Sequence, residues 1–142
     1  MSEENDEQIL LESYHPESRK ILILDHDDHS VWAFILDGET EEIEFDGFVC
    51  SISEPVETEE EVEKFLEEGF SPRITKAFAS NSCHQPEILS KDFKADWLDE
   101  YTVEVSIDEE LFLLMDINNG VCFTKSVKED GPYGLCFEEK QS

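Results

Sequence analysis

The sequence predicts an α+β fold, a mostly antiparallel sheet of about five to seven strands with one to three helices packed on it. The apolar run Leu111 to Met115 reads as a central strand or a buried helix, and the Asn119-Gly120 pair that follows favours a strand, because both residues accept the positive φ of a tight hairpin turn. Apolar runs and turn residues alternate between residues 20 and 53. Thr58 and Glu61 form a capping-box pair that marks the start of a helix.

The chain of 142 residues has the size of a single domain, residues 1–142. Residues 1–18 are polar and acidic apart from one apolar island at residues 9–11. Pro16 argues against a helix through this segment. We therefore expect a loose acidic N-terminal arm with room for one short docked element.

A β-meander is predicted over residues 20–53. Residues 20–24 and 31–36 are apolar runs around a polar connection, which is typical of a hairpin with a long tip. After the Asp37-Gly38 turn, residues 42–46 alternate strictly, so Ile43 and Phe45 are predicted to face inward. The three acids that alternate with them then form one row on the other face.

A helix follows from Thr58, and Gly69 is a natural stop. Residues 69–91 read as an irregular connection. Phe93, Trp97 and Leu98 indicate a short helix, whereas residues 102–107 alternate as a strand that leads into the central hairpin. A turn at residues 131–134 precedes a last strand at 135–137.

The net charge of −27 excludes nucleic acid and anionic membranes as good partners, because phosphates would be repelled, and it favours a basic protein. The N-terminal residues lack the features of a secretory signal, and no apolar run has the length of a membrane helix. The four cysteines are widely spaced and contain no CxxC pair, so we expect them to be reduced and buried in a cytoplasmic protein. No cofactor is expected.

The strongest functional feature is an acidic band. From Asp37 to Glu68 there are fourteen Asp or Glu and one cation, Lys64, which gives a net charge of −14 + 1 = −13. A charge run often serves solubility alone, but these acids fall on ordered faces of a predicted strand and a predicted helix. The predicted partner-binding residues are Glu42, Glu44, Asp46, Glu60, Glu63 and Glu67.

Two other clusters are candidate sites. Residues 25–29, which include His26 and His29, resemble a metal cluster, but they fail the pattern of a calcium loop and have weak zinc spacing. Cys83 and His84 could be a nucleophile and a base, but adjacent residues rarely point at each other. No phosphate-binding glycine loop or hydrolase motif is present, so the chain is not expected to be an enzyme or to bind a metal.

In size, acidity, cytoplasmic character and lack of a catalytic motif, the chain resembles bacterial toxin-immunity proteins, including the antidotes of contact-dependent or secreted nuclease toxins. The resemblance lies in overall character. It implies a cytosolic inhibitor that masks the basic cleft of a cognate toxin domain. Two alternatives stay open: a DNA mimic that blocks a DNA-binding protein, and a small metal or cysteine enzyme that uses Cys83, His84, His26 and His29. Sequence alone identifies neither the partner nor the oligomeric state.

Overall fold

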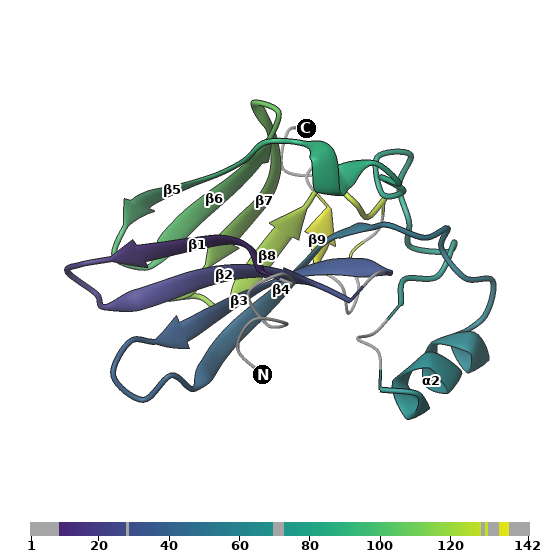
Figure 1. Ribbon diagram of the computed structural model, residues 1–142, viewed down its shortest axis with the longest axis horizontal. Helices are drawn as coiled ribbons and strands as arrows, with labels where there is room; N and C mark the ends of the chain where they lie inside the picture. The colour runs from purple at the N-terminus through teal and green to yellow at the C-terminus, as the bar shows by residue number, and fades with distance from the viewer. Residues whose placement is uncertain (1–8, 28, 70–72, 129, 131–133, 137–142) are drawn as a thin grey trace.

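The computed structural model describes residues 9–27, 29–69, 73–128, 130 and 134–136. Within these residues the fold is α+β, with two sheets that face each other and one α-helix beside them (Figure 1). The first sheet has the order β1-β2-β3-β4 and the second β5-β6-β7-β8-β9. The first sheet comprises β1 (Ile9–His15), β2 (Lys20–His26), β3 (Ser30–Asp37) and β4 (Ile43–Ser51). The second comprises β5 (Phe93–Asp99), β6 (Thr102–Ile107), β7 (Glu110–Asp116), β8 (Val121–Thr124) and β9 (Leu135–Cys136).

The α+β class and the antiparallel pairing are confirmed, but the prediction of one sheet is wrong. Neighbouring strands in both sheets run antiparallel except β8 and β9, which are parallel. The predicted central hairpin is confirmed: β7 pairs with β8 around a turn in which Gly120 has a φ of 68°. β7 is the middle strand of the second sheet.

The core lies between the sheets and draws on both. Alternate residues of the first sheet, such as Leu22, Leu24 and Ile35, pack against Val103 and Leu113 of the second. The two-layer arrangement buries the apolar residues of the strands, because each sheet must cover one face with another element. Strands β1 and β5 are neighbours along one side, and β4 lies beside β7 and β8 along the other.

Two segments differ from the sequence-based expectation. Residues 9–15 form the edge strand β1, which is longer than the short docked element expected within a loose arm, while residues 1–8 lie outside the described part. Residues 93–99 form β5 and not a helix. In β5, Phe93 and Trp97 pack on the core while Lys94 and Asp96 are exposed, which is the two-residue period of a strand.

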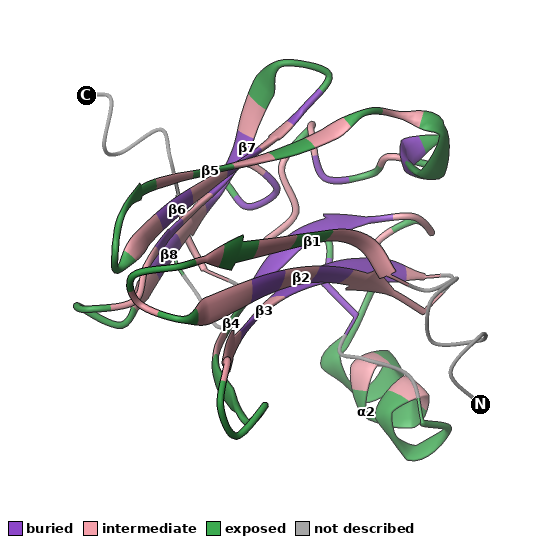
Figure 2. Ribbon diagram, turned by 60° about the vertical axis from the view of Figure 1, so that its left-hand side comes forward, coloured by how far each residue is buried: buried purple, intermediate pink, exposed green. Residues whose placement is uncertain are grey.

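Helix α2 (Glu59–Glu67) and its cap are confirmed. The Thr58 hydroxyl accepts a hydrogen bond from the backbone N–H of Glu61, and the Glu61 carboxylate accepts one from that of Thr58. Gly69 follows with a φ of 97°. No residue of α2 is buried, so the helix stands beside the sheets instead of covering one (Figure 2). A short 3-10 turn, η1 (Ile88–Ser90), buries Ile88 in the main core.

Candidate functional site

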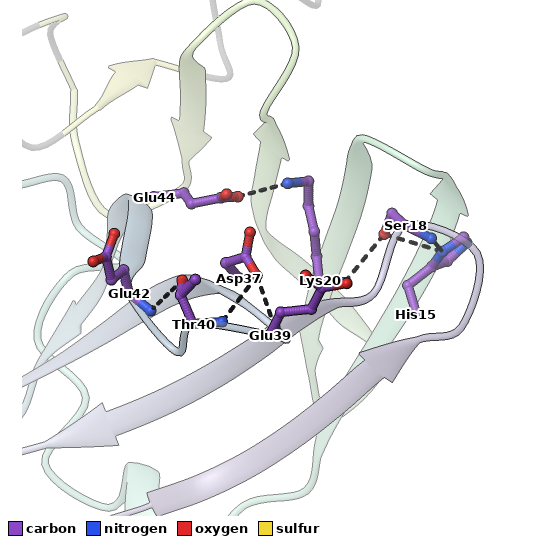
Figure 3. Close-up of polar contacts among 8 residues, drawn as sticks. All are labelled: His15, Ser18, Lys20, Asp37, Glu39, Thr40, Glu42 and Glu44. Atoms are coloured by element: carbon purple, nitrogen blue, oxygen red, sulfur yellow. Dashed lines mark hydrogen bonds and ion pairs between the residues drawn. The ribbon is translucent and has the colours of Figure 1, made fainter.

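The turn between β3 and β4 is a self-capped loop that carries carboxylates into solvent (Figure 3). The Asp37 carboxylate accepts hydrogen bonds from the backbone N–H groups of Glu39 (2.7 Å) and Thr40 (3.2 Å). These bonds favour the ionised form and hold the pKa of Asp37 below its ordinary value, with help from Lys20. The turn therefore has a fixed shape, and Glu39, Glu41 and Glu42 project from it exposed.

A β-bulge breaks the predicted acidic row of β4. Phe45 pairs with Ile35, but Ile43 pairs with Leu36, so Glu44 is an extra residue in the ladder. Phe45 consequently packs on the core, whereas Ile43 is 60% exposed, and the prediction that Ile43 faces inward is wrong. Strict alternation across this segment fails because one inserted residue changes the face of everything before it.

The three acids of the predicted row therefore have different surroundings. Glu42 lies in the turn before the strand begins, where its backbone N–H donates to the Thr40 hydroxyl. Glu44 forms an ion pair with Lys20 at 2.5 Å, and the Lys20 side chain is only 15% exposed (Figure 3). Asp46 pairs in register with Phe34 on the outer face of the sheet. All three are exposed, but they do not form one row.

Helix α2 is attached mainly through one aromatic side chain. The Phe65 ring centroid lies 5.2 Å from that of His29, in an edge-on arrangement, and 4.5 Å from the Arg73 guanidinium carbon. Arg73 is buried and donates a hydrogen bond to the carbonyl oxygen of Glu54. Val62 of the helix is also partly buried, whereas Glu60, Glu63 and Glu67 are all exposed.

Helix α2, which carries Glu60, Glu63 and Glu67, and the turn between β3 and β4 lie at opposite ends of the first sheet (Figure 1). His29, which touches α2, immediately precedes β3, and the acidic turn immediately follows it. The seven steps along β3 span roughly 23 Å at about 3.3 Å per residue. The two predicted groups therefore do not form a continuous acidic surface.

A feature that the sequence-based reasoning missed lies on the outer face of the first sheet. Register places Ile21 and Ile23 of β2 beside Leu36 and Phe34 of β3 on one face, and the face that packs on the second sheet is the other one. At one end, Trp32 and Phe48 on this outer face are covered by Ile74 and by Phe78. The other end is a depression of about 390 Å³, with an apolar floor and the carboxylates of Asp25 and Glu41 in its lining. The lining consists of Ile9, Ile23, Asp25, Phe34, Leu36, Glu41 and Ile43.

In the two clusters that the sequence offers as catalytic or metal sites, Cys83 lies in the core and Asp27 and His29 form hydrogen bonds within the hairpin tip. Cys83 is fully buried, and this burial raises the pKa of its thiol to about 12, whereas His84 beside it is exposed. The Asp27 carboxylate accepts the backbone N–H groups of His29 and Ser30 at 3.0 Å each, which closes the hairpin tip, and His29 Nδ1 lies 2.9 Å from the Ser53 hydroxyl. Asp28 lies outside the described part of the chain.

No family model, curated protein or solved structure matches the chain. Among the described residues, no helix has the length and apolar character to cross a bilayer, and no three His, Cys, Asp or Glu side chains are grouped to hold a metal ion. Three cysteines, Cys50, Cys83 and Cys122, are free and buried, as the sequence predicts.

Proposed function

We propose that this chain is an acidic binding protein that masks a basic surface of a protein partner, most concretely an immunity protein that neutralises a cognate nuclease-type toxin. A nuclease needs a basic cleft to hold phosphates, and carboxylates held on a stable scaffold can occupy such a cleft. Electrostatic complementarity of this kind accelerates association and selects the partner by charge.

The observation that carries this proposal is the exposed face of α2. Glu60, Glu63 and Glu67 follow one another at spacings of three and four residues, which places them on one side of the helix and makes them repel one another. No ion pair among the described residues involves any of them, although Lys64 lies on the same helix. A face that is unfavourable in the isolated chain becomes favourable when a cationic surface covers it.

The acids of the β3–β4 turn and the start of β4 form a second acidic group. Arg19 and Lys20 pair with Glu39 and Glu44, each at 2.5 Å, so those two charges are already compensated within the chain. Glu42 and Asp46 take part in none of the ion pairs of the described residues. The carboxylates available to a partner at this end are therefore fewer than the sequence implies, and we assign α2 the larger share of the partner contact.

Affinity capture tests the proposal. The tagged chain is used to capture proteins from native lysate of the source cells, and a captured protein of basic isoelectric point is then expressed with and without the chain. We expect one stoichiometric basic partner whose toxicity or nuclease activity is abolished by the chain. In stopped-flow mixing, its association rate should fall steeply as NaCl rises, because screening acts within about 8 Å at physiological ionic strength.

Matched variants decide whether the position of the charge matters. The triple variant Glu60→Gln, Glu63→Gln, Glu67→Gln removes three charges from α2 and should weaken capture. The control Asp96→Asn, Glu100→Gln, Glu109→Gln removes three exposed charges from the second sheet and its turns and should leave capture unchanged. Equal weakening by both triples, or an association rate that does not respond to salt, would show that the charge serves solubility alone.

A further inference from the structure

The depression on the outer face of the first sheet combines an apolar floor with acidic residues in its lining. Ile23 pairs with Phe34, and Leu36 pairs with both Ile21 and Ile43, so these side chains share one face. The segment that carries Ile74 and Phe78 packs on the cluster to which Phe34 also belongs, but neither residue lines the depression. Ile43, at the start of β4, lines the depression and is exposed.

Asp25 is the polar group that gives the depression its chemistry. It follows Ile23 on the same face of β2 and is partly buried. Its Oδ1 atom is buried and has no hydrogen-bond partner among the described residues. Burial raises the pKa of this carboxyl, although the neighbouring His26 acts in the opposite direction through a backbone hydrogen bond and its charge.

Further carboxylates border the same face. Glu41 lines the depression, and register places Glu12 opposite Ile23 and Asp46 opposite Phe34. Glu12 and Asp46 are both exposed. A side chain that enters the depression therefore meets an apolar floor bordered by negatively charged carboxylates.

We propose that this depression binds a lysine or arginine side chain of a basic partner protein, with its aliphatic stem along Ile23 and Phe34 and its charged group on Asp25 Oδ1. Lysine and arginine have the matching construction, because their stems bury against apolar surface while the head keeps a charge-assisted hydrogen bond. An apolar residue of the same partner segment packs on Ile43. This assignment rests on the proposed function and names the anchor within it.

Other occupants fit the charge less well. A second copy of the chain, docked by the same face around a two-fold axis, would bring Asp25 and Glu41 against carboxylates of the same face. Anionic ligands and anionic lipid surfaces meet the same repulsion. A cationic segment with apolar neighbours would pack on the apolar floor, attract the bordering carboxylates and donate a hydrogen bond to Asp25 Oδ1.

A defined peptide tests the inference without knowledge of the partner. The probe is a short synthetic peptide of alternating lysine and leucine, and its controls replace leucine by serine or lysine by glutamate. Binding is followed by NMR titration of the full chain, with methyl and amide assignments. We expect shifts confined to the depression, around Ile23, Phe34 and Leu36, and weak or no binding of both control peptides.

Variants then separate specific docking from general attraction. Asp25→Asn should weaken the lysine–leucine peptide by about tenfold or more, since a hydrogen bond to a charged group is worth roughly that factor. Ile43→Ser should also weaken it. The matched controls Asp96→Asn and Leu98→Ser, with Leu98 56% exposed against 60% for Ile43, should leave the affinity unchanged. Equal losses from both pairs of variants, or shifts spread over the acidic surface, would overturn the assignment.

Failure of the Asp25 anchor can be told apart from failure of the proposed function. If the basic partner is captured through α2, yet Asp25→Asn and Ile43→Ser leave its dissociation rate unchanged, the function stands and the anchor is refuted. If no partner is captured but the peptide binds at Asp25 as described, the anchor stands and the function is refuted. A dimer in analytical ultracentrifugation that Ile43→Ser dissociates would assign the face to a second copy and also refute the anchor.

Discussion

Replacing Gly47 by alanine should destabilise the fold at a point where the first sheet packs directly on the second. A Cβ at this position would lie 2.5 Å from Cys122 Sγ, 3.3 Å from Met115 Cε and 3.5 Å from Leu113 Cδ1. The first distance is far inside van der Waals contact, and all three atoms belong to the opposite sheet. Gly47 pairs in register with Ala33, so small residues on the first sheet make room for the second.

The magnitude follows from two opposing effects. Inserting a methyl group into a packed core destabilises by about 1–3 kcal/mol. Replacing glycine within a strand returns about 0.5–1 kcal/mol, because alanine loses less conformational freedom on folding. The net expectation is a loss of about 1–2 kcal/mol, which lowers the melting temperature by roughly 3–8 °C in a domain of this size.

The variant Cys122→Ala supplies the decisive comparison. It removes the Sγ atom that the new methyl group would strike, so each single substitution should destabilise while the double variant is more stable than their sum. Urea denaturation of all four proteins gives the coupling energy, which we expect to be about 1 kcal/mol in favour of the pair.

The control is Gly69→Ala, where nothing lies within 4 Å and the substitution is strained only by a φ of 97°. Its effect should add to that of Cys122→Ala without coupling. If Gly47→Ala also adds without coupling, the two sheets do not meet at this glycine and the packing argument is refuted.

Three further predictions concern thiols, acid and metal. In a Cys136→Ser background, the thiols of Cys50, Cys83 and Cys122 should react with an aromatic disulfide reagent only at the rate of unfolding, because burial raises their pKa; rapid labelling of the native chain would contradict this. The pKa of Asp37 is lowered in the fold, so the stability that this carboxylate contributes is present above its ordinary pKa of 3.8 and is lost as pH falls through the lowered value. In Asp37→Asn, the free energy of unfolding should therefore fall less steeply as the pH is lowered. An unchanged pH dependence would refute the assignment. Thermal melts with and without EDTA should superimpose, since no metal-binding group is found among the described residues, and a large drop with the chelator would count against this.

The parts of the fold that the sequence predicted are those fixed by local chemistry. The Asn119-Gly120 pair marks the turn of the central hairpin, in which Gly120 takes a positive φ and Asn119 does not. The capping box needs only Thr58 and Glu61 at the right spacing. Both signals act over a few residues, and both are present in the structure.

The parts that were missed depend on partners distant in sequence. Strand β1 is interrupted by a bulge between Ile9 and Leu11, so its apolar residues do not alternate cleanly and its pairing with β2 is what orders it. In β5, Phe93, Trp97 and Leu98 also fit a helical spacing, and the strand is selected by its ladder with β6. The division into two sheets arises from packing between them, which no local pattern encodes.

For the candidate site, the exposure of the acids was predictable and their arrangement was not. Glu42, Glu44 and Asp46 are exposed, as are the three glutamates of α2, because charged residues rarely tolerate burial. Their arrangement was changed by one inserted residue at Glu44 and by the attachment of α2 at the far end of β3. The alternation of apolar and polar residues predicts neither the bulge nor the position at which α2 docks.

The depression has a sequence counterpart that is visible once the two sheets are known. Strands β2 and β3 are apolar at successive positions, so both of their faces require a cover. The second sheet covers one face. On the other face, the segment around Ile74 packs on Trp32, Phe48 and Phe34 but does not line the depression, and α2 has no buried residue. The described chain thus leaves half of an apolar face open and surrounds it with carboxylates. A cationic partner with apolar neighbours would cover this half and neutralise its rim in the same contact.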